Sequence, residues 1–138
     1  MPVYDFYHDM VKNALVKDGW TITDDPFIIE FKGLRLYAEL GAEKTIAAER
    51  SGRRIVVEIK VFSSPSLISE LEKTVGQYSI YRTFLKRISP DRELYLAIAQ
   101  DVYQDFFRRP AIQEIISDQQ ISLLVFEPEA EEVVKWIS

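Results

Sequence analysis

The sequence predicts a single α/β domain in which a mixed central sheet is flanked by helices. The chain has 138 residues, which is the usual size of one domain. Of these residues 47% are hydrophobic and 28% are charged, as in ordinary globular proteins. Segments of helical periodicity also alternate with apolar β segments along the chain. We therefore expect one domain over residues 1–138.

The N-terminal part predicts a helix followed by short strands. Over residues 4–18 the apolar side chains recur at helical spacing, and Gly19 stands where a C-terminal cap is expected. Short β segments at 20–23, 27–31 and 34–40 follow, with Asp, Pro and Gly marking the turns between them. The pairing of these strands stays open.

The strongest hairpin signal joins residues 45–50 to residues 53–62 through Ser51 and Gly52. The second segment is dense in β-branched residues, which favour strands. We expect it to form the centre of the sheet.

A long helix is predicted after the hairpin. Ser64 is read as its N-cap and Pro65 as its first helical residue, and Ser89 with Pro90 marks its end. A continuous apolar stripe between these points supports one uninterrupted helix.

The last third of the chain predicts two strands and two helices. The buried strands are residues 94–99 and 122–126, and the helices between them are 101–107, capped by Asp101, and 111–118. The tail, residues 129–137, fits either an amphipathic helix or a strand, because its paired apolar residues match both periods.

Composition excludes several classes of function. The chain has no cysteine, so disulfides, thiolate nucleophiles and cysteine zinc sites are absent. Its one histidine, His8, precludes a multi-histidine metal site, and we expect it at the surface or at a helix cap. A net charge of -5 argues against a DNA-coating protein, because such proteins depend on summed phosphate contacts.

The location is predicted from the apolar runs and the N-terminal stretch. No apolar run approaches the ~20 residues that a membrane span requires. The first ten residues, MPVYDFYHDM, carry acidic side chains where a secretory signal has a basic and then an apolar stretch. We expect a cytoplasmic protein with no membrane partner.

The candidate site lies on the second hairpin strand, whose side chains alternate between two faces. One face is wholly apolar, whereas the other carries Arg54, Val56, Glu58, Lys60 and Phe62. An acid and a base therefore stand between apolar side chains on a surface that should be partly covered. Because charges are rarely buried without a partner, this pair indicates a functional site.

A two-residue hairpin loop would bring a second carboxylate to the same face. In that register Thr45 lies opposite Glu58, and Glu43 lies opposite Lys60. Glu43 and Glu58 could then hold Mg²⁺, or Mn²⁺ in its place, together with waters and phosphate oxygens. A lysine beside this cation can orient or help deprotonate the water that attacks a phosphodiester. A three-residue loop would turn Glu43 to the opposite face.

The tripeptide Glu58-Ile59-Lys60 after a hairpin resembles the ExK half of the PD-(D/E)xK nuclease superfamily. On the following helix, Gln77 and Tyr81 share one face and resemble the Q-x-x-x-Y motif of the RecB-like branch. The resemblance implies a restriction-endonuclease-like fold.

The resemblance also implies roles for particular residues. Glu58 and Glu43 would be the metal ligands, Lys60 would act on the water, and Gln77 and Tyr81 would support the site. In the superfamily the first metal ligand is usually aspartate. Here the well-placed carboxylate is Glu43, and Glu39 and Glu49 are the alternatives. Glu49 ranks last, because it lies four residues past Thr45, roughly 13 Å along the strand from the position opposite Glu58.

Over nearly its whole length the chain is similar to a bacterial family of fdxN element excision controlling factors of the XisH type. The similarity runs through VKNALVKDGWTITDDP, AELGAEKTIAAER, VVEIKVF, GQYSIYR, LYLAIA and VVKWI. It implies a part in programmed DNA excision, with DNA and a small companion protein of the same system as partners. The chain size and its many aromatic residues also allow a homo-oligomer.

Three hypotheses about function remain open. The first is an excision accessory factor with a nuclease site, the second a non-catalytic module that binds DNA or protein, and the third a toxin-like nuclease neutralised by its companion. Two basic clusters could contact phosphates, although solvated surface charge is the commoner explanation. They are Arg50, Arg53 and Arg54 at the hairpin, and Arg82, Lys86, Arg87 and Arg92 near the end of the long helix.

Overall fold

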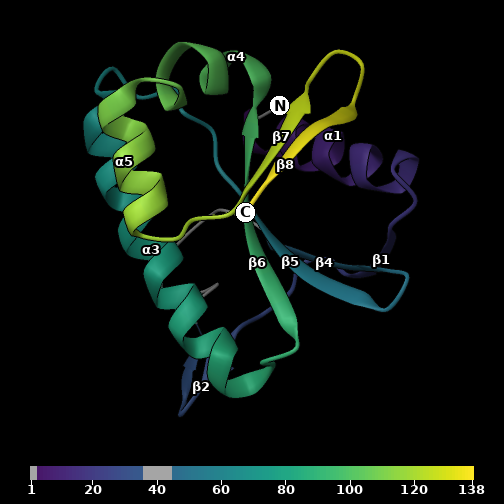
Figure 1. The fold of residues 1–138 in the computed structure, drawn as a ribbon. Coiled ribbons are helices and arrows are strands. Elements are labelled where there is room, and N and C mark those ends of the chain that lie inside the picture. Colours follow the sequence, from purple (N-terminus) through teal and green to yellow (C-terminus); the bar gives the residue numbers. More distant parts are fainter. Residues whose placement is uncertain (1–2, 36–44) are drawn as a thin grey trace.

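The computed structural model describes residues 3–35 and 45–138, and in them one six-stranded sheet lies between two layers of helices (Figure 1). The strands are β1 (Thr21–Asp24), β4 (Thr45–Arg50), β5 (Arg53–Ile59), β6 (Arg92–Ala99), β7 (Leu123–Glu127) and β8 (Glu132–Ile137). Their order across the sheet is β1-β4-β5-β6-β7-β8. Because β5, β6 and β7 are parallel and the outer pairs antiparallel, the predicted mixed sheet is confirmed.

The first helix, α1 (Val3–Lys17), covers one face of the sheet. It buries Val11, Ala14 and Leu15. Gly19 has a φ of +93°, and its N–H donates to the carbonyl of Val16 at 3.0 Å. This left-handed residue ends the helix, so the predicted helix and its cap are confirmed.

The strands predicted at 27–31 and 34–40 are only partly correct. Two-residue strands form instead, β2 (Glu30–Phe31) and β3 (Leu34–Arg35), and they pair with each other outside the main sheet. The Phe31 ring packs 5.4 Å from that of Phe84, so this small hairpin lies against a helix. Residues 36–40 of the second predicted strand lie outside the described residues.

The β4–β5 hairpin has the predicted two-residue loop. Ser51 and Gly52 both have positive φ, as a type I′ turn requires, and Arg50 pairs with Arg53. β5 ends at Ile59, before the predicted 62, because the regular ladder stops there. The N–H of the next residue, Lys60, still donates to the carbonyl of Ala97 at 3.2 Å.

The long helix α3 (Leu67–Ile88) begins later than predicted. Its N-cap is Ser66, whose hydroxyl accepts from the N–H of Ser69 at 3.2 Å, so the assignment of Ser64 was wrong. Ser64 instead accepts from the N–H of Ser66 at 3.3 Å, and Pro65 precedes the cap. The predicted end is confirmed, because Ser89 is the C-cap.

The segment after β6 differs in detail from the prediction. It contains α4 (Gln100–Val102), the π-helix η1 (Tyr103–Phe107) and α5 (Pro110–Asp118). Asp101 is not the N-cap: Ala99 occupies that position, and the Asp101 carboxylate accepts from Val102 N–H at 2.8 Å. The ambiguous tail is a strand, β8, paired with β7.

Alternate residues of β5 and of the segment that follows it enter two separate hydrophobic clusters, which confirms the predicted faces. Val56 and Phe62 pack toward α3 and α5, together with Leu71, Tyr78, Tyr81, Leu85, Phe106 and Phe107. Ile55, Val57 and Ile59 pack toward α1, together with Val11, Leu15, Trp20 and Phe126. Within residues 3–35 and 45–138, no helix is both long and apolar enough to cross a membrane.

Tyr78 joins α3 to two strands. Its hydroxyl donates to the carbonyl of Leu94 at 2.8 Å and accepts from the N–H of Ser122 at 3.1 Å. Burial is the main cause that raises the pKa of Tyr78, and the nearby Glu58 carboxylate raises it further, so the hydroxyl stays protonated and donates.

We predict that Tyr78→Phe destabilises the protein by about 1–3 kcal/mol, because two backbone groups lose their partner inside the fold. Urea unfolding measures this loss. Tyr103→Phe, a partly exposed tyrosine of the segment after β6, is the comparison. Equal unfolding midpoints for wild type and Tyr78→Phe would contradict the role assigned to the hydroxyl.

His8 is buried, so its predicted place at the surface or at a cap was wrong. Its Nε2–H donates to a carboxylate oxygen of Asp25 at 2.6 Å, and Lys12 Nζ lies 3.0 Å from the other oxygen. These contacts fix the segment after β1 onto α1. Partial burial alone would raise the pKa of Asp25, but the bonds from Lys12 and His8 outweigh it and hold that pKa below its ordinary value.

This arrangement predicts a loss of stability in acid. The carboxyl of Asp25 has a pKa of about 3.9 in the unfolded chain and a lower one when folded, so its stabilisation is complete above that value. It disappears as the pH falls through the folded pKa. Between pH 5 and pH 3, the urea midpoint of the wild type should therefore fall more steeply than that of Asp25→Asn. The exposed Asp105→Asn should keep the wild-type slope, and an unchanged slope in Asp25→Asn would refute the assignment.

Candidate functional site

Glu58 and Lys60 lie at the carboxyl end of β5, on the face that α3 covers. In the sheet Glu58 is opposite Thr45 of β4 and beside Leu96 of β6. Only 1% of Glu58 and 5% of Lys60 is exposed, and both carboxylate oxygens of Glu58 are buried. An acid and a base are thus held under cover, where unpaired charges would cost several kcal/mol.

Helix α3 supplies a direct partner for the lysine. Lys60 Nζ donates to Oε1 of the half-buried Gln77 at 3.2 Å, which joins the strand to the helix. One turn further along α3, Tyr81 is buried in the cluster that includes Val56. The fold therefore brings Lys60 and Gln77 into contact, and it turns Tyr81 toward the same side of the sheet.

The predicted second metal ligand, Glu43, lies outside the described residues, as does its alternative Glu39. The other alternative, Glu49, is exposed on β4 opposite Arg54. It is four residues from Thr45, the partner of Glu58, which corresponds to roughly 13 Å along a strand. Glu49 therefore does not approach Glu58.

Glu58 contributes two buried carboxylate oxygens as possible metal ligands. Among residues 3–35 and 45–138, no group of three or more acidic or histidine side chains could hold a metal ion. Of the two predicted ligands, Glu58 lies in the described part of the chain and Glu43 lies outside it. The hard carboxylate oxygens of Glu58 fit Mg²⁺ or Mn²⁺, and a carboxylate from outside that part would have to complete the site.

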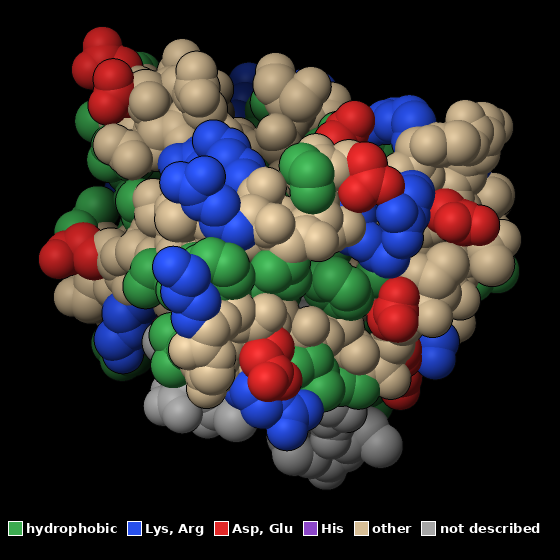
Figure 2. Space-filling view, turned by 90° about the horizontal axis from the view of Figure 1, so that it is seen from below, with side chains coloured by type: hydrophobic (Ala, Val, Ile, Leu, Met, Phe, Trp, Pro, Cys, Tyr) green, Lys and Arg blue, Asp and Glu red, His purple; other side chains and the backbone are tan. Residues whose placement is uncertain are grey.

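The basic cluster at the hairpin is largely neutralised by ion pairs. Arg50 lies 3.4 Å from Asp18, Arg53 lies 2.7 Å from Glu93, and Arg54 lies 2.5 Å from Asp91. Figure 2 shows basic and acidic side chains interspersed around a band of hydrophobic ones on the lower face. The basic side chains of the described residues on this face therefore form no continuous surface for a long DNA contact.

Sequence reasoning missed the polar role of Tyr78, which adjoins Gln77 on α3. Its hydroxyl bonds β6 and the start of β7, and its pKa responds to Glu58. The available signal was a tyrosine at a buried helical position, since a buried hydroxyl needs a hydrogen-bond partner.

Comparisons with known proteins agree on one family. The family model described as XisH protein matches residues 1–134. The crystal structure of an XisH family protein from Nostoc punctiforme PCC 73102 has a TM-score of 0.89 and 41% identity, covering 97% of this chain and 100% of that one. A fdxN element excision controlling factor protein from Anabaena variabilis has a TM-score of 0.89 and 44% identity, covering 97% and 99%. No protein with a curated functional description matches. This chain therefore belongs to the XisH family.

Proposed function

We propose that this protein is an accessory factor of DNA excision that carries a PD-(D/E)xK-like site for metal-dependent phosphodiester hydrolysis. The observation that carries the proposal is the buried Glu58 beside Lys60, whose ammonium is held by Gln77. The excision role is supported by family membership and by the described role of the Anabaena variabilis relative. DNA is then the substrate, a small companion protein the partner, and the cytoplasm the location.

Glu58 would hold the metal together with Glu43. Bound Mg²⁺ or Mn²⁺ supplies Lewis-acid stabilisation of charge on the phosphate oxygens. The apolar side chains around Glu58 lower the local dielectric constant, which strengthens charge interactions inside the site. Burial of this carboxylate is thus compatible with a ligand role.

Lys60 would act on the water and on the phosphate. Its ammonium, held 3.2 Å from Gln77 Oε1, can orient the attacking water and stabilise negative charge that develops in the transition state. Gln77 would fix the direction of the ammonium, and the buried Tyr81 would support the helix face that carries Gln77. Both act as positioning residues.

A plasmid-nicking assay tests this proposal. Purified protein should relax supercoiled plasmid with Mg²⁺ or Mn²⁺ and stop when EDTA is added. Glu58→Gln keeps the shape of the side chain but removes its charge, so it should lose the activity. Glu49→Gln is the matched control, because this exposed carboxylate is distant from the site.

The alternative is a non-catalytic module that binds DNA or a partner protein. One observation favours it: Glu58 and Lys60 are almost completely covered, so they can serve as an internal polar cluster. In that case the protein binds DNA or its companion, no metal increases strand breakage, and Glu58→Gln changes stability only. These results would replace the hydrolytic proposal.

A further inference from the structure

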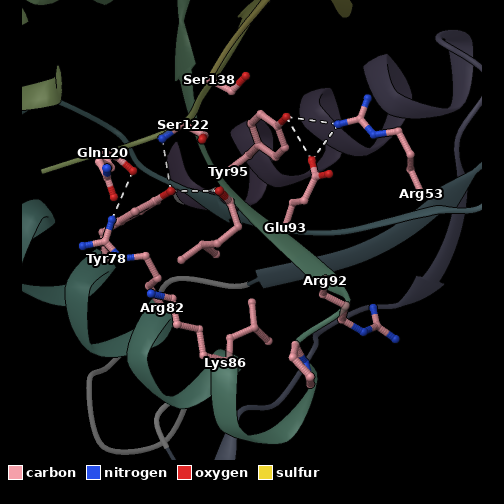
Figure 3. A pocket seen from close by; sticks show the side chains of 13 residues that line it. Arg53, Tyr78, Arg82, Lys86, Arg92, Glu93, Tyr95, Gln120, Ser122 and Ser138 are labelled. Atoms are coloured by element: carbon pink, nitrogen blue, oxygen red, sulfur yellow. Dashed lines mark hydrogen bonds and ion pairs between the residues drawn. The ribbon is translucent and has the colours of Figure 1, made fainter.

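A cavity lies at the amino end of the parallel strands, opposite the end that carries Glu58. It has a volume of about 490 Å³ and is formed by the second half of α3, the start of β6 and the loop that leads into β7 (Figure 3). Arg53, which lines it, is five residues before Glu58 on β5, a separation of roughly 16 Å. The cavity is therefore separate from the Glu58–Lys60 site.

Arg82 is fixed at one side of this cavity. Its Nη1 donates to the carbonyls of Gln119 at 2.6 Å and of Gln120 at 3.1 Å. Its guanidinium also lies over the ring of Tyr78, with 5.3 Å between the guanidinium carbon and the ring centroid. These contacts hold the guanidinium in place without neutralising it, because none of these partners is a carboxylate.

Lys86 adds a second uncompensated charge. It follows Arg82 by four residues on α3, so both side chains project from the same helical face. Like charges at this spacing destabilise a helix slightly. In the part of the chain that the structure describes, neither forms an ion pair with a carboxylate, and both line the cavity.

The other two cations of the cavity wall are already engaged. Arg53 is paired with Glu93 at 2.7 Å and bonds the hydroxyl of Tyr95. Arg92 lies 3.8 Å from Asp24, and Figure 3 shows its side chain turned away from the others. The charge available to a ligand is therefore that of Arg82 and Lys86.

We propose that this cavity binds the phosphate of a nucleotide, either free or within a DNA strand. Arg82 and Lys86 would bind the phosphate oxygens. Gln120, next to Arg82, and Ser122, next to the Tyr78 hydroxyl, add polar groups to the wall (Figure 3). Leu85 and Leu94 give the wall apolar surface for the attached sugar or base. The volume lies within the 300–1,000 Å³ range of typical small-ligand sites.

Lys86→Gln tests the site, and Arg87→Gln is its matched control. Both residues are exposed cations in the last turn of α3, but only Lys86 lines the cavity. The probes are adenosine monophosphate, followed by calorimetry, and a fluorescein-labelled single-stranded oligonucleotide, followed by anisotropy in EDTA. Lys86→Gln should weaken binding by about tenfold or more, and Arg87→Gln by less than about twofold.

The two probes distinguish the sources of the phosphate. Binding of the monophosphate identifies a free nucleotide, whereas binding of the oligonucleotide alone identifies a DNA strand. In the second case Lys86→Gln should also reduce the slope of log K against log salt by about one. The inference is overturned if the wild type binds neither probe, or if both variants lose affinity equally. Both titrations are made in EDTA, so that no divalent metal is available. The result therefore does not depend on metal-dependent hydrolysis at Glu58.

Discussion

Lys60→Met should reduce metal-dependent DNA nicking by at least about 100-fold, the loss typical when a group that stabilises transition-state charge is removed. Methionine has nearly the length of lysine and fits the apolar cover formed by Val56 and Phe62, so the fold should persist. Single-turnover cleavage of plasmid DNA in Mg²⁺ gives the rate, and a thermal melt verifies folding.

A second lysine on the neighbouring helix provides the control for this substitution. Lys73 is exposed on α3, so Lys73→Met removes the same charge from the surface. It should keep the wild-type rate. If Lys60→Met folds and cuts at the rate of Lys73→Met, the ammonium has no part in hydrolysis.

Phe107→Ala should destabilise the protein by about 3–5 kcal/mol, the usual cost of removing a fully buried phenylalanine. Phe107 is 0% exposed, and its ring lies 5.2 Å from that of Phe62 and 5.5 Å from that of Phe106. The substitution opens a cavity under η1, on the face of the sheet that carries Glu58. Guanidinium unfolding measures the free-energy change.

Phe6→Ala serves as the comparison for this core substitution. Phe6 is 48% exposed on α1, so its removal should change stability by less than about 1 kcal/mol. Comparable losses of stability in the two variants would show that the packing of Phe62, Phe106 and Phe107 does not stabilise the α3 side of the sheet.

The central part of the fold could be predicted because local and long-range signals agree there. Ser51 and Gly52 fix a two-residue turn, which sets the register that places Thr45 opposite Glu58. Strand alternation then assigns Val56 to one core cluster and Val57 to the other. Turn chemistry and a period of two were enough to determine both results.

One wrong assignment and one open one arose where local signals compete. Ser64 and Ser66 are both good N-caps, and the choice depends on which hydroxyl meets the N–H of Ser69. The tail 129–137 fits two periodicities, and only pairing with β7 makes it a strand. Neither choice can be read from local propensity.

The geometry of the site depended on contacts between distant segments. The spacing of Gln77 and Tyr81 predicts one helical face, but only the packing of α3 on β5 brings Gln77 to Lys60. In the same way, His8 is buried because Asp25 lies beside it after folding. The roles of Glu58, Lys60 and Gln77 in catalysis stay predictions.

Manganese binding tests the central proposal most directly, namely that the covered carboxylate of Glu58 is a metal ligand. Titration of Mn²⁺ into the wild type and into Glu58→Gln, followed by calorimetry and by the electron paramagnetic resonance of free Mn²⁺, compares the two proteins without DNA. We expect saturable binding by the wild type and none by the variant. Equal binding by both proteins, or no binding by the wild type, would contradict the proposal.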